Sequence, residues 1–183
     1  MTTHDFVPEN GVNVLAFGAD PSGLTDSHAA FAEAAEAANQ KHLPIYIPTG
    51  LYTLESTWLL PSETTVFAEK TARIKLGGAR RKTRGDFLVS NADPVNGNKN
   101  ITIFGGVWDG NNTSANNAKP DLFDKNGYSG AVLNFSGVEQ LMLSGLAVAN
   151  SVTYNIRLTR IENFSIEDID FVSDAFGQNQ DGL

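Results

Sequence analysis

The sequence predicts an all-β fold, a single-stranded parallel β-helix whose coils stack along one axis and whose N-terminal end is capped by an α-helix. One observation is an apolar pattern that occurs twice at the C-terminus, in Val138–Arg160 and Ile161–Leu183. A second is the return of the same short apolar pairs at wider intervals upstream. A third is a lone alanine-rich segment, typical of a helix, near the N-terminus.

The N-terminal third contains the one segment with clear helical character. Asp26 and Ser27 are favoured N-cap residues, and His28–Asn39 after them holds many alanines around Phe31. We expect this helix to lie across the open end of the first coil. There it would cover unpaired strand edges that otherwise promote aggregation.

The strands of the coils are predicted from apolar residues two positions apart, because alternate side chains of a strand point to the same side. In the C-terminal repeat, Leu141 and Leu143 align with Phe164 and Ile166. Similar pairs mark three coils upstream: Ile45/Ile47, Val66/Ala68 and Ile101/Ile103. We therefore expect five coils, in which the first residues of these successive pairs are level with one another.

Length and composition fit one domain over residues 1–183, with the cap at about 1–42 and the coils at about 43–183. A hydrophobic content of 41% supports a core, and 19% charged residues argues against disorder. No run is apolar enough for a membrane helix, and Met1–Asn10 lacks the apolar stretch of a secretory signal. The absence of cysteine excludes disulfides and thiolate sites, and the net charge of −8 argues against nucleic acid as a partner.

Three motifs carry a resemblance to known proteins. Asn13–Ser27 (NVLAFGADPSGLTDS), with the alanine-rich helix and Leu43–Tyr52 (LPIYIPTGLY), resembles the start of the pectate-lyase-like superfamily of right-handed parallel β-helices. Asn100–Gly110 (NITIFGGVWDG) resembles the Gly-Gly-x-x-Asp-Gly coil of polygalacturonase-like glycoside hydrolases of family 28. Asn179–Leu183 (NQDGL) is similar to the Asn-x-Asp-Gly catalytic signature of that family. The resemblance covers nearly the whole chain.

This resemblance implies an inverting hydrolase of pectin-type or related polysaccharides that uses no metal or other cofactor. It assigns Asp181 as the carboxylate that activates water, with Asn179 beside it, while Gln180 stands where the family has Thr. Inversion needs a second carboxyl group roughly 6.5–9.5 Å away. In the family, the remaining catalytic motifs follow at positions beyond Leu183. We therefore expect this sequence to be the N-terminal part of a longer enzyme, catalytically incomplete by itself and able to associate through its last coil.

Two insertions separate the predicted coils. Leu76–Asp86 is basic and Asp109–Gly130 is rich in Asn, and both have the composition of loops. Such loops often wall a binding face. Arg81 and Arg84 in the first insertion could hold acidic sugars, because guanidinium groups bind carboxylates through two parallel hydrogen bonds. A solvated loop is the simpler interpretation of this charge run.

Two further residues are candidates for contact with substrate. Asp174 could line the same cleft as the catalytic motif, although a carboxylate near a turn is more often only solvated. Trp108 could stack on a sugar ring, or it could cover the core. Asp109 with Gly110 predicts a turn rather than a catalytic acid.

Three classes of function remain open. The first is the polygalacturonase-like hydrolase. The second is a polysaccharide lyase, which would need Ca²⁺ held by an acidic cluster and an Arg or Lys base, and we find no such cluster on adjacent predicted coils. The third is a non-catalytic carbohydrate-binding or phage tailspike module, expected to be a trimer.

The expected partner is a polysaccharide substrate, with no membrane and no nucleic acid, and the complete protein is expected to be a monomer. The expected cellular compartment depends on whether Met1 is the native start of the chain. The resemblance implies a secreted or periplasmic protein, whereas a native start at Met1 implies the cytoplasm.

Overall fold

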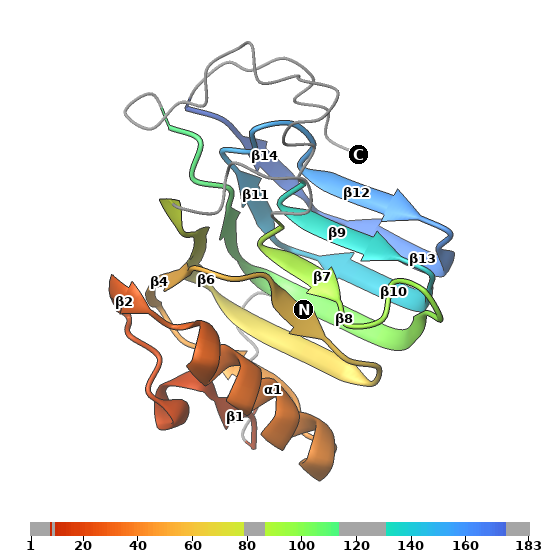
Figure 1. Cartoon of the computed structure of the whole chain (residues 1–183), viewed down its shortest axis with the longest axis horizontal. Helices are drawn as coiled ribbons and strands as arrows, with labels where there is room; N and C mark the ends of the chain where they lie inside the picture. Colours follow the sequence, from red (N-terminus) through yellow and green to blue (C-terminus); the bar gives the residue numbers. More distant parts are fainter. Residues whose placement is uncertain (1–7, 9, 79–86, 114–130, 175–183) are drawn as a thin grey trace.

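The computed structural model describes residues 8, 10–78, 87–113 and 131–174. These residues form a right-handed single-stranded parallel β-helix with one capping α-helix, as the internal repeat predicts (Figure 1). Every strand pairing in the described part of the chain is parallel. The fold prediction is therefore confirmed.

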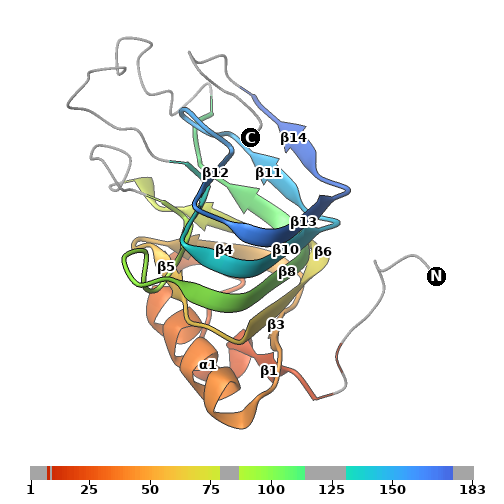
Figure 2. The ribbon, with the colours of Figure 1, turned by 90° about the vertical axis from the view of Figure 1, so that its right-hand side faces the viewer.

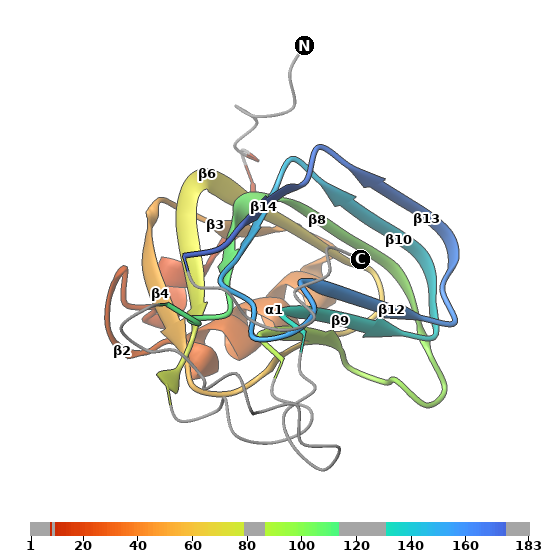
Figure 3. The same ribbon diagram turned by 90° about the horizontal axis from the view of Figure 1, so that it is seen from above.

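Two sheets lie on opposite sides of the core (Figure 3). The four-stranded sheet, called sheet B below, contains β5 (Trp58–Leu60), β7 (Val89–Asn91), β9 (Leu133–Ser136) and β12 (Ile156–Thr159). The ten-stranded sheet, called sheet A, contains β1 (Val12–Asn13), β2 (Ser22–Asp26), β3 (Ile45–Ile47), β4 (Gly50–Leu54), β6 (Thr64–Leu76), β8 (Asn98–Asp109), β10 (Val138–Ser144), β11 (Ala147–Ala149), β13 (Glu162–Glu167) and β14 (Asp170–Val172).

The register confirms three of the four predicted alignments between successive coils and corrects one. Ile45 pairs with Val66, Ile101 with Leu141, and Leu141 with Phe164. Val66, however, pairs with Ile103 instead of Ile101, so that this coil is two residues longer than predicted. An even shift keeps every side chain on its predicted face, because side-chain direction alternates along a strand.

The helix α1 spans His28–Lys41 and ends two residues later than predicted. Figure 2 shows it packed across the end of the coils near β1 and β3, next to the short 3-10 helix η2 (Val14–Phe17). Phe31 on its buried face contacts the rings of Tyr52 and Trp58 edge-on, at centroid distances of 5.5 and 5.1 Å. The helix therefore covers the first coil as expected. No helix in the described ranges is long and apolar enough to cross a membrane.

A column of residues with left-handed backbone runs along sheet A, one residue per coil, within three residues of the start of a strand. Its members, with φ between 54° and 65°, are His42, Glu63, Asn100, Gln140 and Asn163. The strand register places neighbouring members level with one another. This repeated turn makes consecutive coils superpose.

A second bend divides each coil of sheet A. In β8 it falls at Gly105 and Gly106, with φ of 71° and 75°, and two coils later it falls at Asp168. A Cβ on Gly105 would lie 2.2 Å from the carbonyl oxygen of Ala68 on the preceding coil. The Gly-Gly pair of the sequence motif is therefore needed for close stacking of the two coils.

The last described coil leaves apolar side chains exposed. Phe164 is 56% exposed and Phe171 is 45% exposed, although both align with buried residues of the preceding coil. Strand β13 is the end member of the path of sheet A. These aromatic rings thus have a described coil on one side only.

Candidate functional site

Outward-facing side chains of sheet B lie in register from coil to coil. In β12, Ile156 is buried in the core while Arg157 and Thr159 are exposed, as strand alternation requires. The strand register puts one outward residue of each coil in a single column: Leu59, Ser90, Asn134 and Arg157. This column runs parallel to the axis of the β-helix.

The chemistry of this column changes along the axis. At the capped end Leu59 is apolar and 52% exposed. Ser90 and Asn134 follow, both buried, and the Nδ2 of Asn134 donates to the Oγ of Ser90 at 3.1 Å. Arg157 is exposed and makes no ion pair with any described residue. The column is therefore polar in the middle and cationic at its C-terminal end.

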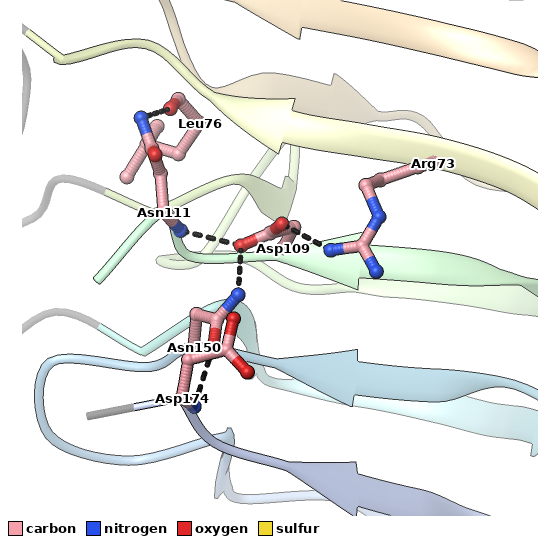
Figure 4. A network of polar contacts seen from close by, with 6 residues as sticks. All are labelled: Arg73, Leu76, Asp109, Asn111, Asn150 and Asp174. Atoms are coloured by element: carbon pink, nitrogen blue, oxygen red, sulfur yellow. Dashed lines mark hydrogen bonds and ion pairs between the residues drawn. The ribbon is translucent and has the colours of Figure 1, made fainter. Parts of the chain in front are cut away.

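One edge of the solenoid carries a polar network at the ends of the strands of sheet A (Figure 4). Asp109, the last residue of β8, is 3% exposed. Its carboxylate accepts from Nη1 of Arg73 at 2.5 Å, from the backbone N of Asn111 at 2.7 Å and from Nδ2 of Asn150 at 3.1 Å. Both oxygens are occupied, so Asp109 has a structural role, consistent with its assignment as a non-catalytic residue.

The network continues to the next coil. Asn150 follows β11, and its Oδ1 accepts from the backbone N of Asp174 at 3.0 Å. On the other side, Nδ2 of Asn111 donates to the carbonyl oxygen of Leu76 at 2.9 Å. Hydrogen bonds thus connect the ends of β6, β8, β11 and β14. The segments 79–86, 114–130 and 175–183 come after β6, β8 and β14 in the sequence.

A pocket of about 330 Å³ lies where the chain passes from the strands of sheet B to β8, β10 and β13 of sheet A. It is lined by Asn96, Gly97, Asn98, Lys99, Gly137, Val138, Glu139, Arg160 and Glu162. Lys99 and Glu139 form an ion pair at 2.7 Å, and this hydrogen bond raises the pKa of Lys99. Nη2 of Arg160 donates to the carbonyl oxygen of Pro94 at 2.7 Å. Of the four charged residues that line the pocket, Lys99 and Glu139 thus pair with each other, and Arg160 is held by a carbonyl outside the lining.

Trp108 does not reach the surface. It is 0% exposed, its ring stacks on Trp58 at a centroid distance of 6.3 Å, and its Nε1 donates to the carbonyl oxygen of Gly105 at 3.0 Å. The prediction that Trp108 contacts substrate is corrected on these grounds. The alternative, that it covers the core, is the observed one.

Of the other predicted site residues, one lies in the part of the chain that the structure describes. Asp174 is described and exposed, and it stays a candidate. Asn179, Asp181, Arg81 and Arg84 lie outside the described residues and stay predictions. The described ranges contain no group of three or more His, Asp or Glu side chains placed to hold a metal ion.

Arg157, an exposed cation on this face, lies outside the sequence motifs. The signal was local: Ile156-Arg157-Leu158-Thr159 alternates apolar and polar residues, which predicts that Arg157 and Thr159 face outward from a strand.

The fold and this polar outer face define a pectate-lyase-like β-helix. Residues 11–182 match the family described as rhamnogalacturonase A/epimerase, pectate lyase-like, and the chain belongs to that family. The resemblance to polygalacturonases that the motifs indicated is thereby supported.

Individual relatives fall into two groups. The chain is 26% identical over 183 residues to a polygalacturonase of Prunus persica, covering 93% of this chain and 44% of that protein. It is 34% identical over 110 residues to the pre-neck appendage protein of Bacillus phage phi29, covering 59% of this chain and 12% of that protein. The chain thus spans less than half the length of either relative.

Among solved structures, the family 28 exopolygalacturonase of Yersinia enterocolitica superposes with a TM-score of 0.74 at 20% identity. The match covers 88% of this chain and 38% of that one. This likeness concerns the fold.

Proposed function

We propose that this chain is part of a glycoside hydrolase that cleaves pectin-type or related polysaccharides by an inverting acid/base mechanism. The outer face of sheet B carries the proposal, because its polar column ends at Arg157, in the coil directly before the Asn179–Leu183 motif. Family membership and the Prunus persica polygalacturonase add support.

A catalytic carboxylate has to face outward from sheet B, and this sets the length of the next coil. Phe135 of β9 is level with Leu158 of β12, and a further coil of the same length would bring Asp181 level with Leu158, which packs against the core. A coil longer by one residue would bring Asp181 level with Arg157 instead. Because a shift of one residue turns every side chain of a strand to the other face, the hydrolase proposal requires the longer coil.

In this arrangement Asp181 acts as the general base that activates water, and Asn179 faces the same side two residues earlier. Successive coils are about 4.8 Å apart. A partner carboxylic acid at roughly 6.5–9.5 Å therefore belongs one or two coils away. We expect it in the part of the native protein that follows Leu183. Since a polymeric substrate is found outside the cell, we propose a secreted or periplasmic enzyme.

A reducing-sugar assay on polygalacturonate and related polymers tests this function. The 183-residue chain is compared with a version extended by the next two or three coils of its native protein. We expect activity in the extended version alone, unaffected by removal of Ca²⁺ and reduced about 10²–10⁴-fold by Asp181→Asn, the usual size of a general-base effect. Asp170→Asn, exposed in β14, is the matched control. Unsaturated products that depend on Ca²⁺ would support the lyase instead.

A non-catalytic binding module is the second candidate, and the phage relative favours it, since 34% identity is higher than the identity to the polygalacturonase. This alternative predicts a trimer that binds polysaccharide without turnover. Light scattering on the extended protein, combined with the same assay, separates the two. A monomer with turnover supports the hydrolase, and an inactive trimer supports the module.

A further inference from the structure

We propose that Arg157 is a specificity-determining residue that binds the carboxylate of a uronic acid unit in the polysaccharide. This inference rests on the proposed function and assigns a residue that lies outside the family motifs. It concerns the charge of the sugar that the outer face of sheet B accepts.

Arg157 faces outward from sheet B. It lies in β12 between two residues of the core layer, Ile156 and Leu158, so its side chain leaves the opposite face of the sheet. Its neighbour in register is Asn134, a buried amide that already donates to Ser90. The guanidinium thus stands at the exposed end of a column whose middle residues, Ser90 and Asn134, are buried.

Arg157 is also uncommitted, while three other cations of the coils have partners. Arg73 pairs with Asp109, Lys99 pairs with Glu139, and Arg160 donates to the backbone of Pro94. Among described residues, Arg157 has no carboxylate partner. An exposed guanidinium in this situation keeps its donors available to a ligand, and its planar fork matches a carboxylate.

The charge of the whole chain makes a local cation necessary for an acidic ligand. With a net charge of −8 the chain repels polyanions at long range, so an acidic polymer needs a nearby positive group to bind. A neutral polysaccharide has no such requirement. The outward guanidinium of Arg157 is the feature of this face that separates the two kinds of ligand.

Binding of two oligosaccharides to the 183-residue chain tests the inference by isothermal titration. One is an oligomer of galacturonic acid, and the other is its methyl ester, which has the same shape without the charge. We expect Arg157→Gln to weaken binding of the acid about tenfold or more, the usual size for a charged hydrogen bond, and to leave binding of the ester unchanged. The affinity of Arg157→Lys for the acid should lie between those of the unmodified chain and Arg157→Gln, because lysine keeps the charge but lacks the planar guanidinium.

Lys70→Gln is the matched control, because it removes the same charge from an exposed position on sheet A. It should not change binding of either oligomer. The inference is overturned if Arg157→Gln weakens both oligomers equally, or neither, or if the unmodified chain does not bind the acid. Failure of the hydrolase proposal is seen separately, as an absence of turnover in the extended protein.

Discussion

The side-chain amide of Asn150 donates to the carboxylate of Asp109 at 3.1 Å, and the two residues are 2% and 3% exposed. They lie at the ends of neighbouring strands of sheet A, β11 and β8, on consecutive coils. A buried polar group without a partner costs free energy. The two residues therefore depend on each other, and together they fix the edge from which the segment 175–183 follows.

Replacing Asp109 by Asn tests this dependence. The change keeps the shape but removes the charge that Arg73 contacts, and it exchanges one acceptor oxygen for a donor. We expect the free energy of unfolding to fall by about 1–3 kcal/mol. Urea unfolding followed by circular dichroism measures it, with the exposed Asp170→Asn as the control. Equal midpoints for both variants would contradict the structural role of Asp109.

The left-handed backbone at Gln140 predicts that this position tolerates glycine better than valine. This residue is exposed and has φ of 65°, so its side chain matters less than its backbone. We expect Gln140→Val to destabilise the protein by about 1–2 kcal/mol and Gln140→Gly to be neutral or stabilising. Thermal unfolding of the two variants, beside Met142→Val later in the same strand, checks this. A Gly variant less stable than the Val variant would disprove the assigned backbone.

Gly105 should not tolerate a side chain. An added methyl group would meet the carbonyl oxygen of Ala68 at 2.2 Å, at a backbone φ of 71°. We expect Gly105→Ala to cost at least about 1–3 kcal/mol through strain and displaced stacking. Gly78→Ala is the control, since a methyl group there meets nothing within 4 Å. Denaturant midpoints that fall equally would show that the bend is not tightly stacked.

Glu69 gives the protein a pH-dependent contribution to stability. Its carboxylate accepts hydrogen bonds from the side chain and backbone of Thr49 and from the hydroxyl of Tyr46, and these lower its pKa below its ordinary value. A pKa that is lower in the folded state contributes stability above the unfolded pKa, and this stability is lost as the pH falls through the folded pKa.

We therefore expect Glu69→Gln to be less stable than the unmodified protein at about pH 7, with the difference shrinking as the pH falls below about 4. Urea unfolding over a pH series measures both. Glu33→Gln, exposed on α1, should show no such convergence. A difference that stays constant with pH would mean that the carboxylate is not stabilised in the fold.

The repeat could be predicted from sequence because its apolar spacing follows directly from strand alternation. Leu141 and Phe164 are level as expected, and α1 begins at the expected residue. The partner of Val66 was missed by two residues because Ile101 fits an alternating pattern as well as Ile103 does, and parity alone does not distinguish them.

The site was harder to predict than the fold. The burial of Trp108 depends on contact with Trp58 from another coil, which no local pattern records. The family motifs consist mainly of acidic residues and do not include Arg157. Its outward position in a strand could still be predicted from the alternation of apolar and polar residues around it. Two partners of Asp109, Arg73 and Asn150, come from neighbouring coils, and only the stacking of the coils brings them to it.

The most direct test of the hydrolase proposal is the anomeric configuration of the first product that the extended protein releases from polygalacturonate, followed by proton NMR. We predict that the new reducing end first appears with the anomeric configuration opposite to that of the cleaved linkage, and that Asp181→Asn slows its formation about 10²–10⁴-fold. A product that first appears with retained configuration, an unsaturated product, or no product at all would contradict the proposal.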